Sequence, residues 1–325
     1  MEKEKDYNFK KLIKWFFNSK DEFFNVVCHP LYDLNLIVCF LSEILDSHKK
    51  VLYITQNFSY VKKILYNKKV SQRDSIIFSK IEDVYKLNSN FDLIIFDDVN
   101  INSDFKDSSI ISFLKNIKCQ KKVVLTMKEI LNNNLVYEIS KDLEIFKEPR
   151  TVCTKIDLDF DIPYVVFEFL EWFMLNEGKV VLVTKNEESS IKVYSYMKKY
   201  VSFSPKLKNL FLERDFESFE DFEGKTFLNS YIYVCTIKFL KEMENIISSN
   251  LNYKNEFNIL VFSAENKNFN YKKLLGLCSV CNFLNDCKNE IIFVFNYENM
   301  EILTAKNIRF NLSKIKSLCL LFAKA

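Results

Sequence analysis

Glycine, proline and histidine are scarce in this chain, which has 3 Gly, 4 Pro and 2 His among 325 residues. Phosphate-binding loops and tight catalytic turns use glycine, because only glycine adopts a positive φ without strain. With glycine only at Gly178, Gly224 and Gly276, the chain has few places for such loops. His29 and His48 are the only histidines, which argues against histidine catalysis and histidine-rich metal sites.

Long apolar runs are also missing. No run approaches the roughly 18 residues that a membrane span requires, and the start, Met1–Asp6, is charged where a signal peptide would be apolar. We therefore expect a cytoplasmic protein. Its 9 cysteines are scattered and odd in number, which predicts reduced thiols. The net charge of +3 does not by itself indicate nucleic-acid binding, which needs a local basic patch.

Short apolar runs alternate with helical patterns along the chain, of which 48% is hydrophobic. The expected strands are residues 25–28, 50–55, 75–78, 91–96, 122–126, 179–184, 231–235, 258–262 and 290–295. The expected helices include residues 34–45, 58–66, 165–175 and 187–200. Near-continuous apolar strands separated by helices predict an α/β fold with mostly parallel sheets covered on both faces.

The alternation breaks at Lys147–Arg150 and then resumes. The strand pattern at 49–55 has an echo at 178–184, each followed by a helix. Two tandem lobes, 1–150 and 151–325, are therefore predicted. Two similar lobes in tandem suggest the RecA-like pair of a superfamily 2 helicase. The alternative is that the two lobes are unrelated α/β domains.

The segment Phe91–Asp98 is an apolar strand that ends in two adjacent acids. In nucleotide-driven motors such a strand brings one carboxylate to Mg²⁺ and a second beside the attacking water. Its usual partner, the phosphate loop G-x-x-x-x-G-K-[ST], occurs nowhere in the chain. Asp97 and Asp98 are thus either remnants of a nucleotide site or solvated residues at a strand end.

The second half resembles the C-terminal lobe of the ComFA competence proteins, which are DNA-import motors related to PriA helicases. The resemblance is carried by Leu260–Phe269, with its Ala-Glu pair after a strand, and by Glu290–Phe293. Upstream, Thr236–Glu242 matches T-T-x-L-E-R-G, with Lys241 at the arginine position.

In the first half, Val26–Asp33 lies where the ComFA family has A-V-C-G-A-G-K-T. Asp97–Asn100 matches D-E-V-D, and Leu125–Thr126 matches the start of L-T-A-T. Lys50–Asn57 lies where the family has a strand that ends in T-P-R. The resemblance covers about residues 20–295 and implies a nucleotide site in the first lobe.

The chain departs from this family where hydrolysis requires specific groups. The degenerate nucleotide site would consist of Cys28, His29, Leu31, Tyr32 and Asp33. Tyr32 replaces the phosphate-binding lysine, and Asp33 would repel phosphate. Val280 and Phe283 stand at the two arginine positions. We therefore expect no active catalytic residues, with Asp97 and Asp98 as remnants.

A metal site is not expected. The spacing Cys278-x2-Cys281-x5-Cys287 lacks a fourth ligand at a usable distance along the chain. Buried reduced thiols explain these cysteines better.

Nucleic-acid contacts are implied by the resemblance, because strand-end threonines of two-lobe helicases face one cleft and hold phosphates of a single strand. The matching threonines are Thr55, Thr126, Thr184 and Thr236. Lys185, Lys238 and Lys241 would add charge. The alternative is that threonine simply suits strand ends.

The resulting hypothesis is a catalytically degenerate, ComFA-like protein that binds DNA or acts as a scaffold in DNA uptake or processing. The resemblance implies single-stranded DNA and a ComF-type, phosphoribosyltransferase-like protein as partners. No cofactor is expected. One alternative is an active ATP-dependent translocase with diverged motifs, which would need ATP and Mg²⁺. The other is a structural subunit of an unrelated complex without DNA contact.

Overall fold

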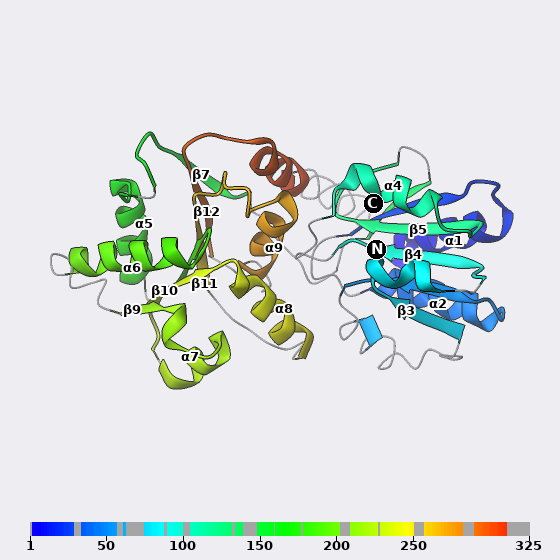
Figure 1. Ribbon diagram of the computed structural model, residues 1–325, viewed down its shortest axis with the longest axis horizontal. Coiled ribbons are helices and arrows are strands. Elements are labelled where there is room, and N and C mark those ends of the chain that lie inside the picture. Colours follow the sequence, from blue (N-terminus) through cyan, green and yellow to red (C-terminus); the bar gives the residue numbers. More distant parts are fainter. Residues whose placement is uncertain are drawn as a thin grey trace. The chain divides into compact units, whose positions relative to one another are not determined.

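The computed structural model describes residues 2–28, 34–56, 61–62, 75–87, 90–99, 105–131, 134–138, 148–158, 160–176, 178–201, 209–226, 228–249, 257–281 and 289–310. Contacts between Cα atoms divide the chain into two compact units. The described residues up to 138 belong to the first unit and those from 148 onward to the second. Each unit has its own sheet, flanked by helices (Figure 1).

The first sheet has six strands in the order β3-β2-β4-β5-β1-β6, and all of its described pairings are parallel. The strands are β1 (Phe23–Cys28), β2 (Val51–Ile54), β3 (Ile76–Ser79), β4 (Leu93–Asp97), β5 (Lys121–Thr126) and β6 (Leu135–Glu138). The helices are α1 (Glu2–Asn18), α2 (Asn35–Asp46), the 3₁₀-helix η2 (Ile81–Lys86) and α4 (Asp107–Lys115).

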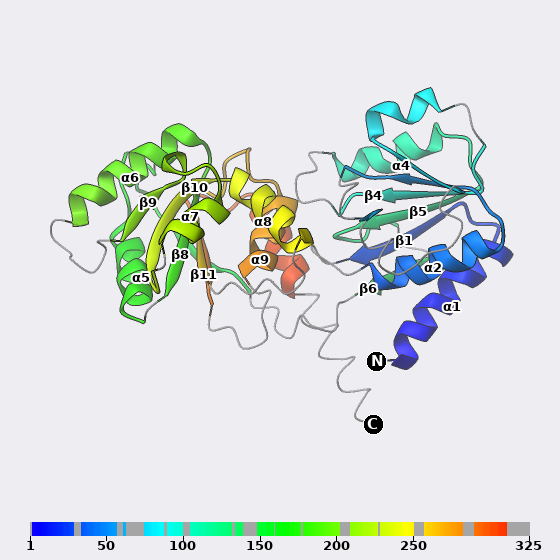
Figure 2. The same cartoon turned by 90° about the horizontal axis from the view of Figure 1, so that it is seen from below.

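Helices cover both faces of this sheet, with α1 and α2 on one side and α4 on the other (Figure 2). On the first face the Trp15 and Phe24 rings lie 5.2 Å apart. On the second face the ring of Phe96 lies 5.7 Å from that of Phe113. Residues 93–96 of β4 are all buried, which explains a continuous apolar run without alternation.

The second sheet also has six strands, in the order β7-β12-β11-β8-β10-β9, with parallel pairings throughout its described part. The strands are β7 (Arg150–Cys153), β8 (Lys179–Thr184), β9 (Leu210–Leu212), β10 (Tyr231–Thr236), β11 (Phe257–Phe262) and β12 (Ile291–Phe295). The helices are α5 (Tyr164–Leu175), α6 (Glu187–Val201), the 3₁₀-helix η4 (Glu213–Asp215), α7 (Phe219–Thr226), α8 (Lys238–Ser249) and α9 (Tyr271–Cys281). A further helix spans 300–310.

The two faces of the second sheet are filled differently. A mostly aliphatic core lies beneath α5 and α6, with residues such as Leu170, Met197 and Val234 fully buried. The opposite core is aromatic: the rings of Phe219 and Phe239 lie 5.0 Å apart and cross nearly at right angles. Edge-to-face pairs of this kind add stability beyond the burial of area.

The predicted α/β class with parallel sheets is confirmed, and every apolar run expected as a strand lies in one. Three strands at or next to the sheet edges were not predicted, namely β6, β7 and β9. The helix expected at 58–66 falls mostly outside the described residues. Among the helices described, none is both long and apolar enough to cross a membrane.

Lys121 joins α1 to the first sheet. Its ammonium group donates hydrogen bonds to the carbonyl oxygens of Trp15, Ser19 and Asp21, at 3.2, 2.7 and 3.0 Å. It also lies 4.9 Å from the centre of the Trp15 ring. Carbonyls at the end of a helix have no partner within the helix, so a lysine there satisfies them. Burial lowers the pKa of Lys121.

We predict that Lys121→Met destabilises the first unit by about 2 kcal/mol, because hydrogen bonds to charged groups contribute about 1.5–3 kcal/mol. Urea unfolding followed by tryptophan fluorescence measures this. A Trp172→Phe background leaves Trp15 as the only tryptophan, since the chain has 2. Lys118→Met is the matched control, because Lys118 is exposed. Equal losses in both variants would contradict the anchoring role of Lys121.

Glu242 of α8 caps the start of α7. Its Oε2 accepts a hydrogen bond from the backbone N–H of Phe219 at 2.8 Å. Burial raises the pKa of Glu242 above its ordinary value of 4.5, and the nearby carboxylates of Glu213 and Glu220 raise it further. The folded state therefore holds this proton more tightly than the unfolded state. Ionisation of Glu242 thus lowers stability as the pH rises above about 4.5.

We predict that Glu242→Gln raises the unfolding temperature of the second unit near pH 8 and has little effect near pH 4. The glutamine keeps an oxygen for the Phe219 N–H and carries no charge. Differential scanning calorimetry at the two pH values measures the difference. The control is Glu168→Gln on the exposed side of α5. A stabilisation that is the same at both pH values would show that the charge of Glu242 is not the cause.

Candidate nucleotide and nucleic-acid sites

Cys28, Asp97 and Thr126 end three strands of the first sheet, and the strand order places these ends at one edge. In the parallel register Val27 lies beside Thr126, and Asp97 lies beside Leu125. Ligands of open α/β sheets bind outside the carboxyl ends of the strands, so the predicted nucleotide site falls at this edge. Its other predicted members lie outside the described residues: His29, Leu31, Tyr32 and Asp33.

The carboxylate of Asp97 is engaged by the protein itself. Its Oδ2 accepts a hydrogen bond from the Tyr53 hydroxyl at 3.1 Å, and its Oδ1 accepts one from the Val99 N–H at 3.2 Å. Asp98 is only 2% exposed, and its backbone N–H donates to the carbonyl of Leu125. A motor needs the first acid at Mg²⁺ and the second beside water. Here, both acids contribute to the packing of the strand end.

The start of α2 differs from a phosphate-binding helix. Its N-cap is Leu34, which has a left-handed backbone with φ 55° and provides no side-chain cap. The leucine side chain is 1% exposed. A positive φ at a bulky residue is strained, and phosphate loops place glycine where the backbone must approach the ligand. An apolar, strained N-cap therefore stands where a helix of this type would receive phosphate.

The four strand-end threonines lie where the sequence places them, at the ends of β2, β5, β8 and β10. Each is 4% exposed or less: Thr55, Thr126, Thr184 and Thr236. The Thr126 hydroxyl accepts from the Asn25 amide and donates to the Lys128 carbonyl, both at 2.7 Å. The Thr184 hydroxyl lies 2.6 Å from that of Ser190. These hydroxyls make hydrogen bonds within the protein.

Thr236 binds a carboxylate of its own chain. The backbone N–H of Thr236 donates to Glu213 Oε2 at 2.9 Å, and its hydroxyl donates to Oε1 at 3.4 Å. The first amide of α8, that of Lys238, donates to the same hydroxyl at 3.3 Å. Glu213 thus occupies the position at which this strand end would hold an anion. Lys238 and Lys241 are exposed on α8 beside it.

The second lobe has no arginine at the predicted positions. Val280 is 2% exposed within α9, and Phe283 lies outside the described residues. Arg309, which the sequence reasoning missed, is fully buried near Cys278, and burial lowers its pKa. Burial also raises the pKa of Cys278 to about 11, so this thiol stays protonated. No three metal-ligating side chains gather anywhere in the described parts of the chain.

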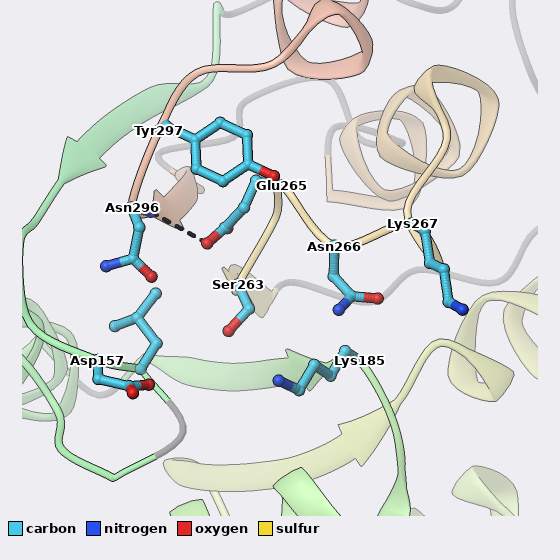
Figure 3. Close-up of a pocket in the computed structure, with 9 residues that line it drawn as sticks. Asp157, Lys185, Ser263, Glu265, Asn266, Lys267, Asn296 and Tyr297 are labelled. Atoms are coloured by element: carbon cyan, nitrogen blue, oxygen red, sulfur yellow. Dashed lines mark hydrogen bonds between the residues drawn. The ribbon is translucent and has the colours of Figure 1, made fainter.

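A polar pocket of about 270 Å³ lies at the carboxyl edge of the second sheet (Figure 3). It is built from segments that follow β7, β8, β11 and β12: Asp157, Leu158, Lys185, Ser263, Glu265, Asn266, Lys267, Asn296 and Tyr297. The chain leaves β8 toward one side of the sheet and leaves β11 toward the other. Such a switch point is where open α/β sheets bind ligands.

Sequence reasoning missed this pocket, although it singled out Lys185 and the Ala264–Glu265 pair. Its walls come from four strand ends spread over residues 157–297. Only the strand order brings them together, and the apolar runs alone do not give that order. One signal was present for three of the four walls, because their residues follow the ends of the predicted strands at 179–184, 258–262 and 290–295.

No family model matches this chain, and no curated protein matches its sequence. Among solved structures, the ATP-dependent Type ISP restriction-modification enzyme LlaBIII bound to DNA is similar over 97% of this chain, with a TM-score of 0.52 and 10% identity. The DUF1998 helicase MrfA bound to DNA is similar over 95%, with a TM-score of 0.47 and 11% identity. This chain spans 29% of the LlaBIII chain and 48% of the MrfA chain. The likeness to LlaBIII is one of fold, and it supports the predicted pair of tandem RecA-like lobes.

Proposed function

We propose that this protein is a catalytically degenerate member of the helicase-fold proteins that binds single-stranded DNA without hydrolysing nucleotide. The observation that carries the proposal is the engagement of Asp97. Asp97 ends the predicted strand, and its carboxylate accepts hydrogen bonds from the Tyr53 hydroxyl and the Val99 N–H. If a motor lost its nucleotide site, the carboxylate that had bound Mg²⁺ would stay at the strand end and form hydrogen bonds within the protein instead.

The finer role extends the resemblance to ComFA proteins. In this proposal 1–150 and 151–325 are the two lobes, and the protein serves as a binding or scaffolding subunit in DNA uptake or processing. A ComF-type protein is the proposed partner. Fold likeness to a DNA-bound enzyme, LlaBIII, agrees with DNA as the ligand. No cofactor is needed for this role.

Two alternatives remain. An active translocase would require ATP and Mg²⁺ at the Cys28–Asp97 edge, and the burial of Asp98 and Leu34 argues against it. A structural subunit without DNA contact is favoured by one observation, the carboxylate of Glu213 at the Thr236 strand end. That carboxylate would repel a phosphate placed there. The DNA surface in our proposal therefore depends on the exposed lysines of α8 more than on the threonine hydroxyls.

We predict that phosphate release from ATP stays at background with or without single-stranded DNA. The lysine and both arginines that neutralise charge are replaced, and one such arginine alone contributes about 10³–10⁵ in rate. Asp97→Ala should change nothing. Turnover that is stimulated by DNA and lost in Asp97→Ala would favour the translocase instead.

We predict weak, salt-dependent binding of labelled single-stranded DNA, measured by fluorescence anisotropy at two salt concentrations. Lys241→Glu should weaken binding for every sequence by the same factor, because phosphate contacts carry no base information. Glu213→Gln should strengthen it by removing a carboxylate from the strand end. Thr236→Val should weaken it less than Lys241→Glu, since a neutral hydrogen bond contributes only about 0.5–1.5 kcal/mol.

The matched control for Lys241→Glu is Lys198→Glu, the same charge reversal at an exposed site on α6. Equal losses in the two variants would mean that only the net charge matters. If the wild-type protein does not bind at low salt, the structural subunit without DNA contact is the better account.

A further inference from the structure

β7 is the outermost strand of the second sheet. It pairs in parallel with β12, with Val152 beside Val294 (Figure 1). On its other side no strand lies among the residues that the structure describes. Arg150, Thr151 and Cys153 of this strand are exposed. An accessible outer strand of this kind is a template on which another extended segment can pair.

The backbone of β7 offers hydrogen-bonding groups on its outer side. The N–H of Thr154, the residue after β7, donates to the carbonyl of Phe295 on β12 at 2.9 Å. In a parallel pair, the N–H and C=O groups of every second residue point toward the same neighbouring strand. Val152 therefore shares the direction of Thr154, and the backbone groups of Thr151 and Cys153 point outward. A segment that pairs with β7 bonds to these two residues.

A groove of about 270 Å³ lies beside β7 on the face that α5 covers. Val152 belongs to this face, because it packs against the core beneath α5. Only two of the 12 residues of α5 are charged, and Trp172 is 53% exposed. A helix as apolar as this one is normally covered on more than one side. The apolar walls of the groove are Val165, Phe169, Trp172, Phe173 and Ile292.

Charged groups at the groove restrict what can occupy it. The Arg150 guanidinium lies 3.0 Å from the Glu290 carboxylate, so these two charges compensate each other. The carboxylate of Glu168 also lines the groove and is exposed. Within the described part of the chain it has neither an ion pair nor a hydrogen bond. The groove thus carries one uncompensated negative charge, which favours a lysine or arginine of the occupant.

We propose that the outer side of β7 binds an extended segment of a partner protein, which adds a strand to the second sheet. The segment carries a large apolar side chain that fills the groove and a basic side chain that pairs with Glu168. These two residues stand two positions apart, because alternate residues of a strand face the same side. In complexes of this kind the backbone hydrogen bonds supply affinity, and the pocket for a side chain supplies specificity.

A second copy of this chain fits the surface less well. In a two-fold pairing through the outward groups of Thr151 and Cys153, Val152 of one copy stands opposite Val152 of the other. Thr154 of the second copy then lies opposite Arg150. Its small polar side chain leaves the groove unfilled.

This surface is independent of the proposed DNA binding. Arg150 begins β7 and Glu290 precedes β12, so the groove lies toward the amino ends of these strands. The candidate nucleotide and nucleic-acid sites lie at the carboxyl ends. Oligonucleotide binding that fails while a peptide still binds therefore overturns the proposed function and leaves this inference intact.

The test selects a phage-displayed library of random octapeptides on the immobilised whole chain. Enriched peptides, made synthetically and labelled, are then titrated by fluorescence anisotropy. They should share a large apolar residue and a basic residue two positions away. Thr151→Pro removes an outward N–H, and proline is tolerated in a strand where the N–H faces away from the sheet. It should weaken binding by about tenfold, whereas Thr151→Val keeps the N–H and should not.

Two side-chain variants test the same surface without a change of backbone. The wild type should prefer the selected peptide by about threefold over a version whose basic residue is glutamate. Glu168→Lys should reverse this preference, and the matched reversal Glu43→Lys, at an exposed site on α2, should not. Trp172→Ala should weaken both peptides by about tenfold, because it removes an apolar wall of the groove. Tyr7→Ala, which removes a tyrosine that is 64% exposed on α1, should leave binding unchanged.

The inference is overturned if no peptide is enriched, or if the enriched peptides bind Thr151→Pro, Glu168→Lys and Trp172→Ala as tightly as the wild type. Light scattering tests the other occupant. A wild-type dimer that becomes a monomer in Thr151→Pro would assign the outer side of β7 to a second copy and would also overturn the inference. If Thr151→Pro fails to fold, the preference of Glu168→Lys decides.

Discussion

Burial on both faces is the constraint on which the other features of these two sheets depend. Helices cover each sheet from both sides, so the strand interiors carry almost only apolar side chains. All described pairings are parallel, so the carboxyl ends of the strands in a sheet share one edge. Polar side chains therefore gather at that edge, where the chain also meets ligands in open α/β folds. Whether such an edge can bind a ligand depends on whether its polar side chains already form hydrogen bonds within the protein.

At the first edge and at part of the second, the partners come from the chain itself. Tyr53 binds Asp97, Asn25 binds Thr126, and Glu213 binds Thr236. Each of these contacts satisfies a group that a nucleotide or a phosphate would satisfy in a working motor. Scarce glycine has the same consequence, because a loop without it cannot bring several N–H groups close to a phosphate. Internal hydrogen bonds thus stabilise the fold at the positions where we propose that ligand binding has been lost.

The apolar runs were sufficient to predict the strands of the interior, because burial on both faces leaves a strong signal in sequence. The edge strand β7, Arg150–Cys153, escaped prediction because its residues are mostly exposed and mixed in character. Asp97 and Thr236 could be placed at strand ends from sequence, yet their partners could not. Tyr53 is 44 residues from Asp97, and Glu213 is 23 residues from Thr236, distances that no local pattern spans. The pocket was missed for the same reason. The sequence also could not show that Oε2 of Glu265 lacks a hydrogen-bond partner among the described residues.

Glu213 and Glu265 make opposite use of similar positions at the edge of the second sheet. Both carboxylate oxygens of Glu213 accept hydrogen bonds from Thr236, so the carboxylate occupies the place where an anion could bind at that strand end. Glu265 accepts the Asn296 N–H with one oxygen, and its other oxygen is buried without a hydrogen-bond partner among the described residues. Folded proteins satisfy nearly all of their buried acceptors, so the unpaired Oε2 of Glu265 is a cost that the rest of the fold has to offset. Two carboxylates at one edge of this sheet therefore differ in how fully the protein itself satisfies them.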